Sequence, residues 1–162
     1  MLYDGAVTFF NLDQMTSAID LAKLYVEALV KSGGNPTEVH YQRVSKLYLL
    51  IPADNVDKTS YLSASLKWSS GDNGVGDPRL HQHLAYGLWA EKEYGQSTHH
   101  FLHSRDGEGC GQMLAEYHSK KGLASEVDLF IARLVLQYLC MKKHIPAATA
   151  FHSYTTTHPK LR

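Results

Sequence analysis

Histidines are the residues of this chain whose number and spacing most suggest chemistry. There are ten in 162 residues. They include an H-x-H pair and a tight cluster: His81, His83, His99, His100 and His103. A zinc site needs about four ligands in tetrahedral geometry, and Glu108 and Cys110 follow the cluster. The spacing nevertheless matches no strong zinc signature, so we expect hydrogen-bonded or solvent-facing histidines, with no metal and no cofactor.

Cys110 is the residue that a nucleophilic mechanism would use, with a nearby histidine as its base. Gly109 and Gly111 flank it and would expose backbone N–H groups. No third group that would orient the base is evident. A metal-dependent or thiol enzyme using the His99–His103 and Cys110 region is therefore the less favoured alternative. We expect Cys110 to be a small residue packed in a turn, and the chain not to be an enzyme.

The composition gives no preference for nucleic acid or for membranes. Sixteen Lys and Arg residues balance sixteen Asp and Glu residues, and 44% of the chain is hydrophobic, as in ordinary globular proteins. The aromatic residues are not interleaved with basic ones, as a stacking platform for nucleic acid requires. The longest apolar run, residues 129–141, contains Arg133 and Gln137 and is too short to span a bilayer. We expect neither nucleic-acid binding nor direct membrane insertion.

Cysteine usage and the first residues favour the cytosol. Cys110 and Cys140 are far apart and form no C-x-x-C pair, which suits free thiols in a reducing compartment. Met1 is followed by Leu-Tyr-Asp, without the basic segment that opens a secretory signal.

The elements that would position these residues are helices, and the central pair lies within residues 77–102. Asp77 can cap the first helix, and Pro78 suits its first position. Apolar residues recur at helical spacing on both sides of a break at Tyr94-Gly95: Leu84, Leu88, Trp89, Ser97 and Phe101. This order is typical of a tetratricopeptide-like helical hairpin. Ser97 would be the small residue where the two helices approach closely.

Amphipathic spacing predicts further helices on both sides of this hairpin. They are expected over residues 2–10, 15–32, 37–51, 55–68 and 112–120, and as a helix pair over 125–157 whose first helix covers 125–140. Residues 69–77 are expected to form a flexible, protease-sensitive loop, and residues 103–111 a turn. The helix over 125–140 is apolar nearly all round, so it should be buried on most sides.

The same order of large and small residues returns 50 positions later, which indicates repeats. Leu84, Ser97 and Phe101 correspond to Leu134, Ala147 and Phe151. One such hairpin cannot bury its own apolar face, so neighbours must stack on it. The predicted fold is all-α: a right-handed α-solenoid of antiparallel helix pairs, with about eight helices in a single segment over residues 1–162.

Four long blocks of the chain resemble a known family. They are SLKWSSG (65–71), DPRLHQHLAYGLW (77–89), HFLHSRDGEGCGQMLAEY (100–117) and SEVDLFIARLVLQYLC (125–140). They are similar to subunit four of the guided-entry-of-tail-anchored-proteins pathway, also described as the 35-kilodalton subunit of the transmembrane-domain recognition complex. The resemblance is closest to animal members. Against that family, the first helical repeat and most of the C-terminal half beyond His158 are absent.

The resemblance implies a non-catalytic adaptor in post-translational targeting of tail-anchored membrane proteins to the endoplasmic reticulum. Such an adaptor bridges a targeting ATPase to a chaperone arm. That arm contains a ubiquitin-like protein and, in animals, a BAG-domain scaffold. The family's N-terminal helices face the ATPase, and Asp20 is the position carried over to this chain. Its C-terminal half grips the other partners, which implies a groove along residues 125–157 with Tyr138, Phe151 and Tyr154 as anchors. Burial in the core is the alternative role for each of these aromatics.

A second class of function also stays open. The chain could be a generic tetratricopeptide-like domain that binds peptide carboxylates. Such a clamp needs several Lys, Arg or Asn side chains converging on a concave face, and Lys92 is the main candidate.

Overall fold

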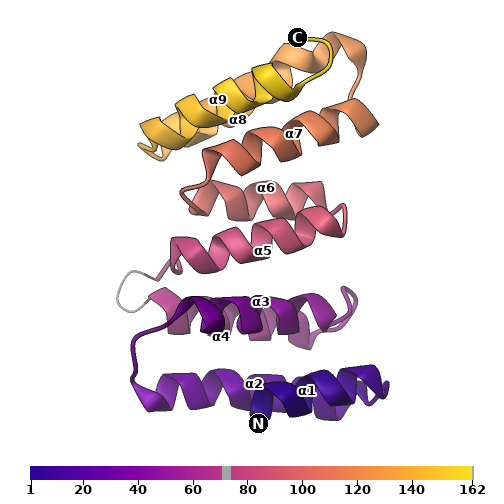
Figure 1. Cartoon of the computed structure of the whole chain (residues 1–162), viewed down its shortest axis with the longest axis vertical. Helices are drawn as coiled ribbons and strands as arrows, with labels where there is room; N and C mark the ends of the chain where they lie inside the picture. Colours follow the sequence, from indigo (N-terminus) through magenta and orange to yellow (C-terminus); the bar gives the residue numbers. More distant parts are fainter. Residues whose placement is uncertain (71–73, 162) are drawn as a thin grey trace. The chain divides into compact units, whose positions relative to one another are not determined.

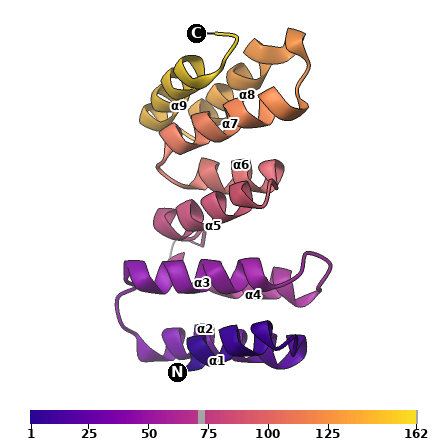
Figure 2. The same ribbon diagram turned by 45° about the vertical axis from the view of Figure 1, so that its right-hand side comes forward.

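The computed structural model describes residues 1–70 and 74–161. Its nine α-helices are α1 (Leu2–Asn11), α2 (Met15–Ser32), α3 (Glu38–Leu50), α4 (Asp57–Ser70), α5 (Pro78–Ala90), α6 (Tyr94–His103), α7 (Gly107–Lys121), α8 (Val127–Cys140) and α9 (His144–Thr157). The packed pairs α1–α2 and α8–α9 run antiparallel (Figures 1 and 2), and the described residues contain no strand. The expected all-helical fold is confirmed, and the described residues form nine α-helices where about eight helices were expected.

The chain divides into two compact units, Met1–Gly87 and Leu88–Arg162. The boundary falls inside α5. Part of the loop predicted over residues 69–77, namely residues 71–73, lies outside the described residues. No described helix is both long and apolar enough to cross a lipid bilayer.

In the N-terminal unit, α1 packs on α2 and α3, and α4 packs on α2 and α3. The core of this unit includes small residues of α2, such as Ala18 and Ala22, and large residues of α3, such as Leu47. Tyr61 of α4 is fully buried, and its hydroxyl donates to the Val44 carbonyl at 3.1 Å. This bond satisfies a polar group that would be costly to bury alone.

Asp77 caps α5 as its sequence position predicts. The backbone N–H of Arg79 donates to Asp77 Oδ1 at 2.8 Å, and the Tyr41 hydroxyl donates to Asp77 Oδ2 at 3.0 Å. The Arg79 guanidinium also bonds this carboxylate. The hydrogen bonds from Arg79 and Tyr41 hold the pKa of Asp77 below its ordinary value, although partial burial of the carboxyl acts in the opposite direction. The cap therefore ties the start of α5 to α3.

In the C-terminal unit, α7 packs on α6, α8 and α9, and α8 packs on α9. The largest buried side chains come from all four helices and include Phe101, Met113, Leu134, Tyr138 and Tyr154. The Tyr138 hydroxyl donates to the Phe101 carbonyl at 3.1 Å, and the Tyr154 hydroxyl donates to the Val127 carbonyl at 2.8 Å.

The prediction of a turn over the whole of residues 103–111 is wrong. The helix α7 begins at Gly107, five residues before the predicted start, and Asp106 caps it by accepting from the Gly109 N–H at 2.8 Å. The glycines serve close packing. A Cβ at Gly111 would lie 2.5 Å from the Ala150 carbonyl oxygen, and one at Gly107 would collide with the Pro146 carbonyl.

The expectation that the helix over 125–140 is buried on most sides is also wrong. One face of α8 is buried, through Val127, Ile131, Leu134 and Tyr138. Leu129 and Leu136 are 63% and 61% exposed. The helix is apolar on a side that no described element covers, which is why its sequence resembles that of a fully buried helix.

Candidate interaction surface

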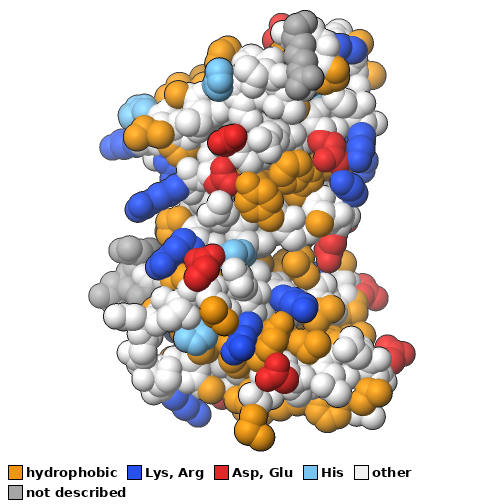
Figure 3. All heavy atoms as spheres, in the orientation of Figure 1, with side chains coloured by type: hydrophobic (Ala, Val, Ile, Leu, Met, Phe, Trp, Pro, Cys, Tyr) orange, Lys and Arg blue, Asp and Glu red, His pale blue; other side chains and the backbone are white. Residues whose placement is uncertain are grey.

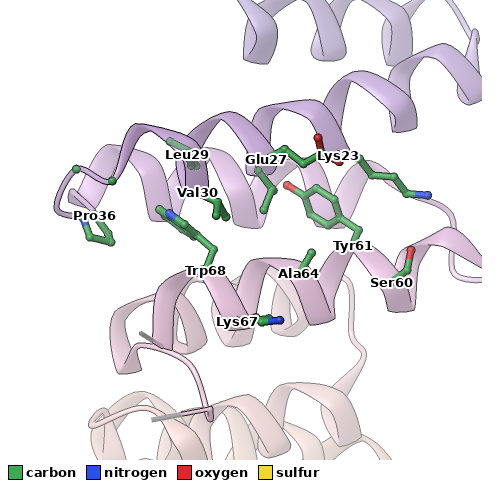
Figure 4. Close-up of a pocket in the computed structure, with 13 residues that line it drawn as sticks. Lys23, Glu27, Leu29, Val30, Pro36, Ser60, Tyr61, Ala64, Lys67 and Trp68 are labelled. Atoms are coloured by element: carbon green, nitrogen blue, oxygen red, sulfur yellow. The ribbon is translucent and has the colours of Figure 1, made fainter. Parts of the chain in front are cut away.

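A groove lies between α2 and α4 in the N-terminal unit (Figure 4). It has a volume of about 710 Å³ and an apolar floor that includes Val26, Leu29 and Trp68. Val30 also lines it and is 57% exposed. At the rim, Lys23 pairs with Asp57 at 2.6 Å. The groove therefore combines an accessible apolar floor with charged edges, as protein-binding grooves do.

Asp20 lies on α2 and is exposed. It does not line the groove. It precedes Lys23 by three residues and Glu27 by seven, so the three side chains share one face of α2. Lys23 and Glu27 are both groove residues. Asp20 therefore extends the charged edge of the groove along the same helix face.

The three aromatic residues predicted as groove anchors separate into two roles. Tyr138 and Tyr154 are 0% exposed, and both hydroxyls bond backbone carbonyls within the unit. Tyr138 and Tyr154 therefore have the alternative role, which is burial in the core. Phe151 is 53% exposed on α9. Of the three, Phe151 is the one whose side chain can contact a partner without unfolding the core.

Phe151 belongs to a larger set of exposed apolar side chains on the last two helices. The others are Leu129, Leu136, Leu139, Met141 and Ile145. Figure 3 shows apolar side chains at the surface among charged ones on the face in view. Exposed apolar side chains that gather on one part of a protein often mark an interaction site. We call this set the α8–α9 apolar surface.

A second groove separates α6 from α8 and has a volume of about 450 Å³. Leu102, Leu129 and Phe130 line it, with His99 and Arg133 beside them. The α8 helix thus contributes to the core and to this groove, and Leu129 belongs both to the groove and to the α8–α9 apolar surface.

The residues of the predicted central hairpin are in the core or next to it. Leu84, Leu88, Ser97 and Phe101 are each at most 1% exposed. Trp89 is partly exposed and meets Phe101 edge-on, with ring centroids 6.4 Å apart. Its indole N–H donates to Glu116 Oε2 at 2.9 Å. These residues support the helices and offer little surface to a partner.

Glu116 of α7 is a feature that sequence reasoning missed. Besides Trp89, its carboxylate accepts from Lys92 at 2.7 Å, from the Tyr94 hydroxyl at 2.9 Å and from Lys120 at 2.6 Å. Bonds from Lys120 and Lys92 hold the pKa of Glu116 far below its ordinary value. The spacing of Glu116 and Lys120, i and i+4, was the one available signal.

The geometry gives little support to thiol chemistry. Cys110 is fully buried, and burial raises the pKa of its thiol to about 12, so the nucleophilic thiolate is not populated near neutral pH. Among residues 1–70 and 74–161, no group of three or more His, Cys, Asp or Glu side chains is placed to hold a metal ion.

The histidines do not form one cluster. His81 bonds the Val75 carbonyl and His83 pairs with Glu38. His99 and His103 do lie together, with ring centroids 4.9 Å apart. Burial, His99 and Lys143 lower the pKa of His103.

Lys92, the main candidate for a carboxylate clamp, is already bound to Glu116. Its amine therefore neutralises the Glu116 carboxylate of the same chain. The interpretation as a peptide-carboxylate clamp is therefore less well supported, because its main candidate residue already has a partner.

Antiparallel helix pairs that follow one another along the chain are typical of the class of helical-repeat proteins. The profile of the family described as Golgi to ER traffic protein 4 matches residues 1–162. The chain belongs to this family.

Individual relatives agree with this assignment. The chain is 45% identical over 162 residues to Golgi to ER traffic protein 4 homolog of Xenopus tropicalis, and 43% identical to the Homo sapiens homolog. Both alignments cover 99% of this chain and 50% of the relative. The chain thus spans about half the length of the curated relatives it matches. A crystal structure of C. therm. Get4 has the same fold, with a TM-score of 0.81 over 96% of this chain and 23% identity.

Proposed function

We propose that this chain is a non-enzymatic adaptor in the targeting of tail-anchored membrane proteins to the endoplasmic reticulum. In this role it works in the cytosol, and it joins a targeting ATPase to an arm made of a ubiquitin-like protein and a BAG-domain scaffold. The observation that carries the proposal is membership of the Golgi to ER traffic protein 4 family over all 162 residues. That membership supports a role in tail-anchored protein targeting.

The two units offer separate surfaces for the two sides of such a bridge. The α2 face with Asp20, together with the α2–α4 groove, is the proposed ATPase-facing surface. The α8–α9 apolar surface around Phe151 is the proposed surface for the ubiquitin-like protein or the scaffold. Each surface lies within one unit, so each could bind its partner independently of the other.

An enzymatic role has less support, because the candidate nucleophile is buried and its pKa is raised. A carboxylate clamp has less support as well, because Lys92 is paired with Glu116. The surfaces that remain accessible are apolar helix faces with charged edges, which suit protein partners.

Affinity capture from cytosol tests the proposal. The tagged chain and the full-length human relative are used side by side as baits, and the ATPase, the ubiquitin-like protein and the scaffold are quantified. The proposal expects the short chain to retain at least one of the three. If the full-length relative captures all of them and the short chain none, the adaptor role does not belong to this part of the protein.

A further inference from the structure

We propose that His99 and His103 form a surface site for one late first-row divalent metal ion, of which Cu²⁺ is the tightest-binding. The two residues occupy successive turns of α6 on one face. His99 lines the α6–α8 groove together with Leu129 of the α8–α9 apolar surface, so the site borders that surface. It does not rest on the proposed adaptor function.

The distance between the two rings fits chelation. Their centroids lie 4.9 Å apart. Two imidazoles that share a cation through bonds of about 2.1 Å, at an angle between square-planar and tetrahedral, place their ring centres roughly 5 Å apart. The spacing of the two rings is therefore compatible with a bound pair, and rotation of the side chains would bring one nitrogen of each ring to the cation.

A second pair of histidines in the same unit shows what distinguishes this one. His118 and His158 have nearly the same centroid separation, 4.8 Å. Their facing nitrogens, His118 Nδ1 and His158 Nε2, are only 2.8 Å apart and share a hydrogen bond. Both residues are buried. That pair has no space for a cation, whereas His99 is exposed and lines the α6–α8 groove.

The chain supplies two ligands, and water would complete the coordination. No third His, Cys, Asp or Glu among the described residues is placed to join them. Lys143 lies near His103, with its amine bonded to the Leu102 and Ser104 carbonyls. Its positive charge opposes a cation, so binding should be weaker than at a four-ligand structural site. Two imidazoles without thiolate favour Cu²⁺ over Ni²⁺ and Zn²⁺.

Titration of the purified chain with Cu²⁺ alone tests the site. Cys140 is an exposed thiol and would bind or reduce copper, so every protein carries Cys140→Ser. Calorimetry gives the affinity, and electron paramagnetic resonance counts the coordinating nitrogens. The variants are His99→Gln and His103→Gln. The matched control is His152→Gln, an exposed histidine on α9 without a second histidine four residues away.

The parent should bind one Cu²⁺ through two nitrogens. Either variant should lose roughly 10²-fold or more in affinity, because a second ligand on the same helix acts at high effective concentration. His152→Gln should bind as the parent does. Equal affinity in the parent and His99→Gln would overturn the proposal, as would an equal loss in His152→Gln. Since His99 is exposed, its variant remains folded even if His103→Gln does not, and the thermal midpoint without metal verifies this.

Discussion

The Glu116 carboxylate accepts four side-chain hydrogen bonds within the C-terminal unit. It receives hydrogen bonds from the end of α5, from the α5–α6 turn, from α6 and from its own helix. A single carboxylate can accept this many bonds because it has about four lone-pair sites. The network joins α7 to the preceding helix pair at a partly exposed position, where packing alone gives little stability.

Glu116→Gln should lower the free energy of unfolding by about 1 kcal/mol, because charge-assisted bonds are lost at a partly exposed site. The folded-state pKa is depressed, so the stabilisation is complete above the ordinary value near 4.5 and is lost as the pH falls below it. Denaturant titration at pH 7 and pH 4 measures both effects. Glu91→Gln, an exposed neighbour, is the control. Equal loss in the two variants would contradict the role of the network.

The buried pair of His118 and His158 has a definite arrangement of protons. His118 Nε2 donates to the Leu123 carbonyl at 2.9 Å, so its Nδ1 must accept from His158 Nε2. His158 Nδ1 then accepts from the Lys160 N–H at 3.2 Å. All three bonds are satisfied with both rings neutral. An added proton would set two donors against each other, which is costly in a buried site.

Acidification below pH 6.5 should therefore destabilise the protein through this pair. Burial, His118 and Lys160 lower the pKa of His158 in the folded state. The unfolded chain then binds more protons, and stability falls as the pH drops below the ordinary value of 6.5. Thermal unfolding between pH 7.5 and pH 5.5 measures this slope. His158→Gln should flatten it, whereas His152→Gln should leave it unchanged. An unaltered slope in His158→Gln would mean that other groups cause it.

At the scale of elements, the contact of α7 with α9 shows where sequence reasoning failed. The segment His103–Gly111 contains three glycines, which ordinarily predict a turn. Gly107 and Gly111 are instead four apart on one helix face and let α9 approach closely. A helix face made of small residues has the same composition as a loop. The two can be distinguished only once the position of α9 is known. The central hairpin was predictable because its cap and its large residues give unambiguous signals.

Gly111→Ala should destabilise the protein by roughly 1–3 kcal/mol, because the added methyl group overpacks the helix contact. Its Cβ would lie 2.5 Å from the Ala150 carbonyl oxygen, and backbone cannot rotate out of the way. Gly95→Ala on α6 is the matched control, because nothing lies within 4 Å of that Cβ. It should be neutral or stabilising, since alanine favours the helix. Equal midpoints in chemical denaturation would show that α7 and α9 do not pack this closely.

The α8 helix shows a second limit of the sequence. Its apolar residues point in all directions, and periodicity alone cannot tell a buried side from an exposed binding side. Tyr138 and Tyr154 illustrate the same difficulty among the predicted anchors, because aromatic residues are favoured both in cores and at interfaces. Exposure in the structure separates them from Phe151.

At the scale of the whole molecule, the family could be recognised from long sequence blocks before any geometry was known. The profile match over residues 1–162 confirms it. The interaction surfaces could not be derived in the same way. They depend on which helix faces stay uncovered, and this follows from the packing of helices far apart in sequence, as with α7 and α9. Asp20 therefore remains a prediction that only binding data can test.

A bridging assay tests the adaptor proposal most directly. The ubiquitin-like protein and the BAG-domain scaffold are immobilised, and capture of the targeting ATPase is measured with and without this chain. The proposal predicts capture only in its presence. Asp20→Arg should abolish ATPase capture while the chain still binds the surface, and Phe151→Asp should prevent the chain itself from binding. Asp54→Arg and Ala124→Asp, at exposed positions outside both surfaces, should behave as the parent. ATPase capture that does not depend on the chain, or that persists in both Asp20→Arg and Phe151→Asp, would contradict the bridge.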